Sequence, residues 1–327
     1  MSDKKPKIGV VGAGHLGKHH IKHLSNHKGV EFVGVFDINK DSLKNICDEF
    51  SVTSIHSLEE LISSCDAAHI VTPTNTHFDI AKKFLNQKKD IFIEKPITNT
   101  VEEASSLIDL AQKNECIIQV GHIERFNPTI NRLKELVNNP HYIEIERLAP
   151  FQARGTEVPV VLDLMVHDID LILEMIDSPL ESIQASGAKM MSSSVDLAHA
   201  HITFQNGVVA NLKSSRIAQD YVRKIRTYQQ NFYTITDLMI PQIEVYGLEH
   251  HNIFSEKLRS QEIETNSGSK TLYYEKFIPE NKDALLEEIN DFIHCINTRS
   301  KPNVDGQSGA KALEIALQIE NKIFLNE

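Results

Sequence analysis

Short apolar runs alternate with amphipathic stretches in the first third of the chain. The runs lie at residues 8–11, 32–36, 68–71, 90–93 and 117–120. The segments between them, such as residues 101–114, carry apolar side chains at helical spacing and are long enough for right-handed crossovers. This pattern predicts a doubly wound α/β domain over residues 1–122, with a parallel sheet covered by helices on both faces.

After residue 121 the pattern becomes that of helices combined with two-faced strands. Asn127 and Pro128 are typical of a helix N-cap and first helical residue, so we predict a short helix through Val137. In residues 142–148, isoleucine alternates with glutamate, which predicts a strand with one buried and one solvated face.

The remaining pattern predicts a mainly antiparallel, open-faced sheet closed by helices, an α+β domain over residues 123–327. Residues 200–204 and 208–212 alternate in register across an Asn206-Gly207 turn, which favours a hairpin. The other predicted segments are strands at 221–236 and 242–248, a polar loop at 265–270, and helices at 285–296 and 309–324.

Composition narrows the class of partner. The formal net charge is -11, and no lysine- or arginine-rich run is interleaved with aromatic residues, so we expect no nucleic-acid partner. No segment is long and apolar enough to span a bilayer, and no signal-peptide core is present, so we expect no membrane partner. The four cysteines are widely scattered, as is typical of buried thiols in a reducing compartment. We therefore expect a cytoplasmic protein that binds a small molecule.

The run Gly12-Ala13-Gly14-His15-Leu16-Gly17 directly follows the first predicted strand and opens a helix. Its glycines permit a tight turn, close approach of a pyrophosphate, and helix–strand packing. Asp37 ends the second strand about 20 residues later, where a carboxylate accepts ribose hydroxyls. Together they predict a Rossmann dinucleotide-binding domain; the alternative is a glycine-rich turn in some other domain. Asp37 would repel a 2′-phosphate and no arginine follows it, which favours NAD over NADP.

Two further loops follow predicted strands of the parallel sheet. The carboxyl ends of such strands are where an open α/β sheet holds its ligand. One loop carries Thr72, Pro73, Asn75 and His77, and the other carries Glu94, Lys95 and Pro96. We add these residues, except Pro96, to the cofactor site, with Lys95 near the nicotinamide. For the first loop, the alternative is that Pro73 ends the strand and Thr76 caps the next helix.

Asp163 and His167 are candidates for proton transfer. They lie four residues apart in a predicted helix, which places them one turn apart on the same face. A carboxylate beside an imidazole can orient it or raise its basicity. The alternative, which this segment alone favours, is a half-buried histidine with an ordinary carboxylate at a helix N-terminus.

The glycine loop, Glu94-Lys95-Pro96, and Asp163 with His167, in that order, resemble the Gfo/Idh/MocA family of sugar oxidoreductases along nearly the entire chain. The resemblance implies that the open-faced sheet forms the interface of a homodimer or homotetramer. It also implies that Lys95, Asp163 and His167 match catalytic positions. In such enzymes a sugar hydroxyl loses its proton while the adjacent carbon gives a hydride to the nicotinamide.

Our hypothesis for the chemistry gives each of the three matching residues a role. His167 accepts the hydroxyl proton, Lys95 donates a hydrogen bond to the developing alkoxide, and Asp163 holds the geometry. An imidazole titrates near neutral pH, whereas a lysine would need its pKa lowered before it could act as a base. Lys95 and His167 could still exchange roles.

Within the family, residues 121–128, Arg154-Gly155 and residues 160–170 resemble UDP-N-acetylglucosamine 3-dehydrogenases and their relatives. This implies oxidation at C3 of UDP-N-acetylglucosamine to the 3-keto sugar nucleotide. The alternatives are a dehydrogenase of a free sugar or a cyclitol such as inositol, or a non-catalytic NAD-binding regulator.

A sugar-nucleotide substrate needs cationic or amide donors for its diphosphate. Arginine contacts phosphate oxygens in bidentate fashion. Each candidate arginine could equally form a salt bridge. The predicted substrate-binding residues are Arg125, Asn127, Arg154, His167 and Arg216.

Four histidines recur at four-residue spacing on the first predicted helix: His15, His19, His23 and His27. Such a stripe could bind a transition metal. A solvated helix face explains it equally well, and catalysis by this fold needs no metal. We therefore expect no metal site.

Overall fold

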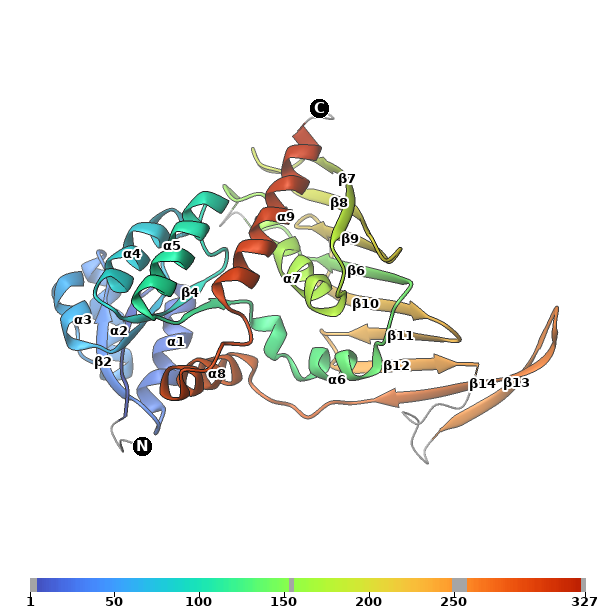
Figure 1. The fold of residues 1–327 in the computed structure, drawn as a ribbon, viewed down its shortest axis with the longest axis horizontal. Helices are drawn as coiled ribbons and strands as arrows, with labels where there is room; N and C mark the ends of the chain where they lie inside the picture. The colour runs from blue at the N-terminus through green and yellow to red at the C-terminus, as the bar shows by residue number, and fades with distance from the viewer. Residues whose placement is uncertain (1–4, 153–155, 249–257, 325–327) are drawn as a thin grey trace. The chain divides into compact units, whose positions relative to one another are not determined.

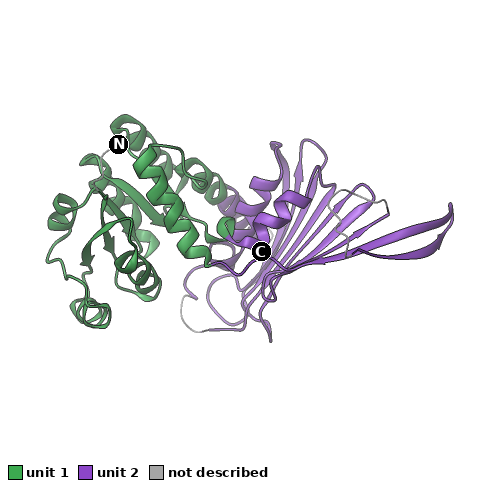
Figure 2. Cartoon of the chain, turned by 90° about the horizontal axis from the view of Figure 1, so that it is seen from below, with its two compact units in different colours: residues 1–126, 283–314 green, residues 127–282, 315–327 purple. Residues whose placement is uncertain are grey.

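The computed structural model describes residues 5–152, 156–248 and 258–324. The chain forms two compact units (Figures 1 and 2). The first contains Met1–Phe126 and Asp283–Glu314, and the second contains Asn127–Lys282 and Ile315–Glu327. The predicted domains, residues 1–122 and 123–327, are consecutive along the chain. The compact units are not, because residues 283–314 belong to the first unit.

The first unit contains a five-stranded parallel sheet in the order β2-β1-β3-β4-β5. The chain passes from β2 on one side of β1 to β3 on the other, and such a reversal is where open α/β sheets bind ligands. The predicted doubly wound fold is confirmed, and each predicted strand is correct to within one residue at each end. The strands are β1 (Lys7–Val11), β2 (Glu31–Phe36), β3 (Ala67–Ile70), β4 (Asp90–Glu94) and β5 (Ile118–Gly121).

Helices cover both faces of this sheet (Figure 1). Helices α1 and α8 lie on the same face, because His20 and Phe292 both contact the rings of His69 and Phe92. Helices α4 and α5 pack against each other on the other face. The helical segments are α1 (His15–Asn26), α2 (Lys40–Phe50), α3 (Leu58–Ser64), η1 (Thr74–Thr76), α4 (His77–Asn86), α5 (Val101–Asn114), η2 (Ile123–Phe126) and α8 (Ala284–Thr298).

The second unit contains a nine-stranded sheet in the order β13-β14-β12-β11-β10-β6-β9-β8-β7. Neighbouring strands are antiparallel except β6 and β9, so the predicted mainly antiparallel domain is confirmed. The strands are β6 (Tyr142–Leu148), β7 (Leu180–Ala188), β8 (Leu197–Phe204), β9 (Val209–Ser215), β10 (Val222–Gln229), β11 (Phe232–Asp237), β12 (Gln242–Gly247), β13 (Arg259–Thr265) and β14 (Gly268–Phe277).

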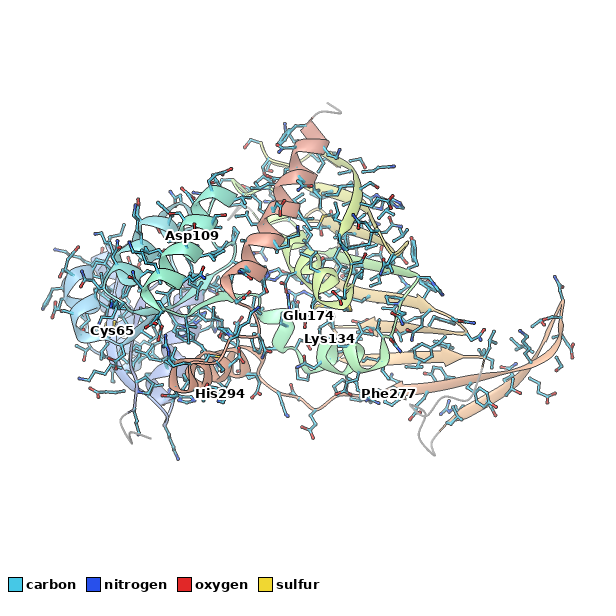
Figure 3. All side chains as sticks on the ribbon, in the orientation of Figure 1. Cys65, Asp109, Lys134, Glu174, Phe277 and His294 are labelled. Carbon is cyan, nitrogen blue, oxygen red and sulfur yellow. The ribbon has the colours of Figure 1, made fainter. Side chains whose placement is uncertain are left out.

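Helices cover one face of the nine-stranded sheet (Figure 1). They are α6 (Pro128–Leu136), α7 (Val166–Met175) and the later part of α9 (Gly306–Phe324). The Asn127 side chain caps α6 by accepting the Thr129 N–H at 3.0 Å, as the sequence predicts. Lys134 of α6 forms an ion pair with Glu174 of α7, and the two labels lie close together in Figure 3.

A row of five tyrosines crosses the opposite face, which we call the open face. Consecutive rings belong to residues paired in register on neighbouring strands, with ring centroids 4.6–5.9 Å apart. Arg226 lies on the same face and forms ion pairs with Glu144 and Glu146. The tyrosines, in order across β6, β10, β11, β12 and β14, are Tyr142, Tyr228, Tyr233, Tyr246 and Tyr274.

Two sequence predictions in the second unit need correction, and one strand was not predicted. The predicted strand at 221–236 is two strands, because the chain reverses before Asn231, whose φ is 59°. The predicted loop at 265–270 already contains the start of β14, which pairs with β13 through Thr265 and Gly268. Much of this hairpin is exposed on both faces, so its side chains lack the alternation that marks a half-buried strand. The sequence analysis also leaves out β7.

No helix in the described ranges is long and apolar enough to cross a bilayer. All four cysteines are free thiols, and Cys47, Cys65 and Cys295 are buried. Burial raises the pKa of the Cys65 thiol to about 12. That thiol is therefore a core side chain and not a reactive thiolate.

Candidate active site

Each glycine of the loop between β1 and α1 meets a different steric requirement. Gly12 has a φ of 110°, and a Cβ on it would stand 2.2 Å from the carbonyl oxygen of Val71. A Cβ on Gly17 would lie 2.1 Å from the Gly12 carbonyl oxygen, so glycine here lets α1 approach β1. A Cβ on Gly14 would meet no atom within 4 Å, which leaves open space beside the loop.

The N-terminus of α1 opens beside the same loop. Gly14 occupies the N-cap position without a side chain to cap the helix, and the first turn contains no acidic residue. His15 and Leu16 in that turn are exposed. Free N–H groups and the helix dipole favour an anion at such a terminus. The residues present therefore fit the pyrophosphate of a dinucleotide.

Asp37 follows β2 and holds the glycine loop. Its Oδ2 accepts the Ala13 N–H at 2.6 Å, and its Oδ1 accepts the Asn39 N–H at 2.7 Å. A carboxylate can accept further hydrogen bonds, so acceptors remain for ribose hydroxyls. Asp37 also lines a cavity of ≈ 430 Å³ with Lys40 and Lys44, two cations that the sequence analysis does not consider. A cavity of this size suits part of a nucleotide.

Replacing Asp37 by alanine is expected to raise the Kd for NADH by about 10-fold or more, and the Kd for NADPH by less. The substitution removes the acceptor for the ribose and leaves Lys40 and Lys44 to face a 2′-phosphate. Fluorescence titration with both reduced cofactors measures the effect. Asp109→Ala, at an exposed residue of α5 outside the cavity, is the control and should change neither Kd appreciably. Equal losses for both cofactors in Asp37→Ala would refute this assignment.

His77 joins the loop after β3 to the loop after β4. It is 1% exposed, and its Nε2 and Nδ1 lie 2.8 Å from the Thr72 carbonyl oxygen and 3.0 Å from the Pro96 carbonyl oxygen. Burial lowers the pKa of His77, and a neutral imidazole donates to only one of the two carbonyls at a time. His77 therefore supports the cofactor site through these loops, since both ring nitrogens face backbone carbonyls.

The remaining residues of the loop after β3 lie near its surface. Pro73 and Asn75 are exposed and Thr72 is half-buried. Thr76 occupies the N-cap of α4, but its hydroxyl lies 2.8 Å from both Thr72 Oγ1 and the Pro73 carbonyl oxygen, donates to one of them, and does not cap the helix. Thr76 is thus the N-cap residue of α4, as the alternative predicted, but its side chain makes no capping hydrogen bond.

Glu94 and Lys95 follow at the end of β4. Glu94 Oε2 accepts the Lys95 N–H at 3.2 Å, and Glu94 Oε1 lies 3.0 Å from His20 Nε2. His20 is buried on α1 and was not predicted as a site residue. His20 follows directly after His19 of the histidine stripe, but it lies on the side of α1 that packs on the sheet, whereas His19 is exposed.

The histidine stripe itself makes ordinary contacts. His23 Nε2 lies 3.3 Å from an Asp283 oxygen, and His27 Nε2 lies 3.0 Å from Asn290 Oδ1 at α8. His15 and His19 meet edge to face. Within the described ranges, no three histidine, cysteine or acidic side chains come together in a way that could hold a metal.

In the second unit, Asp163 and His167 lie at the beginning of α7, but not in one regular helix. Asp163 is in the π-helical turn η3 (Val161–Met165), and α7 begins at Val166. A π-turn is wider than an α-turn, so the prediction of regular α-helical spacing is wrong at this point. Such turns are frequent at functional sites. Both side chains are half-buried.

A buried ion pair fixes α7 to the sheet next to His167. Arg147 of β6 donates from Nε and Nη2 to Asp168 Oδ1 at 2.9 and 2.7 Å. The two side chains are 5% and 0% exposed. This pair was not predicted, although the period of two in β6 places Arg147 on the same face as Ile143 and Ile145.

The predicted substrate-binding arginines have different environments. Arg216 is buried, its Nη2 donates to the Val158 carbonyl oxygen, and its Nε lies 3.8 Å from Asp196 Oδ1. These contacts favour the salt-bridge alternative for Arg216. Arg125 is 9% exposed. Arg154 lies outside the described residues. The side-chain Oδ1 of Asn127 accepts the Thr129 N–H and so caps α6.

Comparisons with known proteins agree with this geometry. The model of the oxidoreductase family with an NAD-binding Rossmann fold, Gfo/Idh/MocA, matches residues 6–122, and the model of a Gfo/Idh/MocA C-terminal domain matches residues 147–247. UDP-N-acetylglucosamine 3-dehydrogenase of Acidithiobacillus ferrooxidans is 33% identical over 96% of this chain and 96% of its own length. The chain belongs to the Gfo/Idh/MocA family. It is an NAD-dependent oxidoreductase.

A solved structure and a second relative are also similar to this chain. A solved structure of the Acidithiobacillus ferrooxidans enzyme superposes with a TM-score of 0.88 at 32% identity and covers 98% of this chain and 97% of that one. Myo-inositol 2-dehydrogenase of Thermotoga maritima is 26% identical over 94% of this chain and 93% of its own length. The relatives of this chain thus include dehydrogenases named for a sugar nucleotide and for inositol.

Proposed function

We propose that this protein is a dehydrogenase that oxidises the C3 hydroxyl of UDP-N-acetylglucosamine to give the 3-keto sugar nucleotide. The similarity to a UDP-N-acetylglucosamine 3-dehydrogenase across both chains supports this substrate more than any other observation. The substrate class is at least that of sugars or related polyols, since inositol dehydrogenases are also similar.

Three residues carry the proposed chemistry. His167 accepts the proton of the C3 hydroxyl, Lys95 donates a hydrogen bond to the developing alkoxide, and Asp163 orients the imidazole. Bound NAD would take up the hydride from C3. His167 is preferred as the base because an imidazole ordinarily titrates near pH 6.5 and a lysine amine near about 10.4.

For the diphosphate of the substrate, Arg125 and Arg154 are the proposed contacts, because Arg216 is engaged by Asp196 and Val158. Asn127 and His167 complete the proposed substrate-binding set. A guanidinium can bind phosphate oxygens in bidentate fashion, which suits the diphosphate of a nucleotide sugar.

The test is NADH formation at 340 nm with purified protein and NAD. The substrates compared are UDP-N-acetylglucosamine, its C6-carboxylate analogue, UDP-glucose, free N-acetylglucosamine and myo-inositol. Turnover with UDP-N-acetylglucosamine alone supports the proposal. Turnover with free polyols would assign the protein to the cyclitol and free-sugar dehydrogenases instead. No turnover with any substrate, together with retained NADH binding, would favour a regulator.

We also propose that the open face of the nine-stranded sheet is the interface of a homodimer or homotetramer. Its tyrosine row offers large aromatic area at low conformational cost, which is characteristic of interface cores. Tyr228 is 38% exposed and the Arg226 ion pairs lie beside it on the same face.

Replacing Tyr233 by aspartate is expected to dissociate this oligomer, since the new charge would be desolvated in the centre of the tyrosine row. Light scattering coupled to size exclusion should give a multiple of 36.9 kDa for the native chain and a mass near 36.9 kDa for the variant. Tyr221→Asp, at a residue outside the row that is 46% exposed, is the control. A native mass of 36.9 kDa would refute the interface.

A further inference from the structure

A buried row of titratable side chains leads through the first unit to the carboxylate beside Lys95. His69 on β3 is 0% exposed and His20 on α1 is 1% exposed. The two Nδ1 atoms are 3.0 Å apart, and His20 Nε2 lies 3.0 Å from Glu94 Oε1. The proposed mechanism uses neither histidine.

The hydrogen positions in this row follow from what each atom can donate. An ionised Glu94 only accepts, so His20 Nε2 carries a hydrogen. His69 Nε2 is buried without a hydrogen-bond partner among the described residues, and a buried N–H without a partner is costly. The hydrogen of His69 therefore belongs on Nδ1 and is donated to His20. Burial lowers the pKa of His69 well below its ordinary value, which agrees with a neutral ring.

Both hydrogen bonds thus point toward Glu94. Burial of this carboxyl raises its pKa, but the hydrogen bond from His20, the electrostatic attraction of His20 and then that of Lys95 together outweigh burial, so the pKa lies below its ordinary value of 4.5. The charged or titratable groups that face it are His20 from α1, Lys95 from its own loop and, more remotely, His77 from α4. From β5 it meets Gly121, where a Cβ would stand 2.9 Å from Glu94 Oε2.

The same carboxylate also fixes the backbone at Lys95. Glu94 Oε2 accepts the Lys95 N–H, and on the other side the Pro96 carbonyl faces His77 Nδ1 at 3.0 Å. Lys95 is therefore held on both sides by buried side chains. Without a donor at His20, the Glu94 carboxylate would lose its partner on Oε1 and remain buried against Gly121.

We propose that His20 is a positioning residue for Lys95, which acts by keeping the Glu94 carboxylate ionised and oriented beside the lysine. The inference rests on the proposed role of Lys95 at the substrate. His20 touches neither substrate nor reacting atoms in this scheme. Its effect is transmitted through one hydrogen bond to Glu94 and one from Glu94 to the Lys95 backbone.

The first test compares kcat against pH in His20→Leu, which removes the donor, and in His20→Gln, which keeps an N–H donor of similar reach. In His20→Leu, we expect kcat to fall by about 10-fold at every pH, because Lys95 is then no longer held in place, whereas the acidic limb, which the proposed base His167 sets, stays where it is. His20→Gln should restore most of the native kcat, and KM should change little in either variant. Native kcat in His20→Leu, a change in KM alone, or equal behaviour of the two variants would overturn the proposal.

A second measurement needs no substrate. In the native protein, the lowered pKa of Glu94 gives stability that is present above pH 4.5 and lost as pH falls through the folded-state value. In His20→Leu the folded-state pKa is raised, so stability should instead fall as pH rises from about 4.5 toward 6. The Tm difference between native and His20→Leu should therefore grow over this range. A difference that stays constant with pH would contradict the inference even if turnover is observed.

The controls separate this inference from the proposed function. His19→Gln, at the neighbouring exposed residue, should leave both profiles unchanged. In a Glu94→Gln background, the Tm difference that His20→Leu causes should no longer depend on pH, and His20→Gln should not change it. Glu94→Gln also serves in place of His20→Leu if that variant does not fold. If no sugar is turned over but the Tm profiles behave as expected, the substrate proposal fails and the His20–Glu94 pair stands.

Discussion

Replacing His167 by asparagine is expected to lower kcat by about 10²–10⁴-fold while leaving the Kd for NADH unchanged. The substitution removes the proposed base but keeps a polar side chain at the beginning of α7. The groups that we assign to NAD binding, including the glycine loop and Asp37, belong to the first unit. Initial rates at 340 nm and fluorescence titration with NADH measure the two quantities separately.

The comparison with Lys95 decides which residue is the base. His199→Asn, the same substitution at an exposed residue of β8, is the control and should have native kcat. If His167→Asn retains kcat within a few fold while Lys95→Met abolishes turnover, then the two residues exchange the roles given to them here. Loss of NADH binding in His167→Asn would instead contradict the assignment of His167 to the substrate.

Replacing Arg147 by methionine is expected to lower the free energy of unfolding by about 3–5 kcal/mol, because it leaves the buried Asp168 carboxylate without its partner. Asp168 is 0% exposed, so water cannot replace the lost hydrogen bonds. Urea denaturation, with the second unit followed separately where the transition is not two-state, measures the change. Activity should fall as well, since this pair fixes α7 next to His167.

The double variant separates the charge from the packing. Arg147→Met with Asp168→Leu should regain most of the lost stability, because a buried pair can be exchanged for apolar residues at little cost. Lys83→Met removes one partner of an exposed ion pair, with Glu59, and should cost about 1 kcal/mol or less. A loss below about 1 kcal/mol in Arg147→Met would show that the pair is not a determinant of stability.

The sequence predicted best those elements whose burial follows a simple pattern along the chain, either buried throughout or alternately buried and exposed. Four of the five strands of the first unit, all except the edge strand β2, are buried over nearly their whole length and consist largely of apolar residues, so their positions were predictable to a residue. β6 has one buried and one open face, and its alternation also gave its bounds. The hairpin of β13 and β14 was not predicted, because much of it is exposed on both faces and its side chains show neither pattern.

The glycine turn to which we assign the cofactor was predictable for a related reason. Close backbone approaches at Gly12 and Gly17 exclude any side chain, so the requirement is recorded in the sequence as glycine itself. Asp37 follows at the end of the next strand, and its place depends only on local chain geometry. Motifs of this kind are local, and local requirements are visible in the order of residues.

Tertiary structure alone decided which polar side chains are buried together. His20 differs from His19 by one position on α1, and only the packing of α1 against His69 and Glu94 makes it a buried donor. The Arg147–Asp168 pair joins a strand to a helix 21 residues later, and the π-turn before α7 changes the spacing that a regular helix would give to Asp163. Such contacts join residues far apart in the chain, and their energies depend on burial, which no local pattern determines.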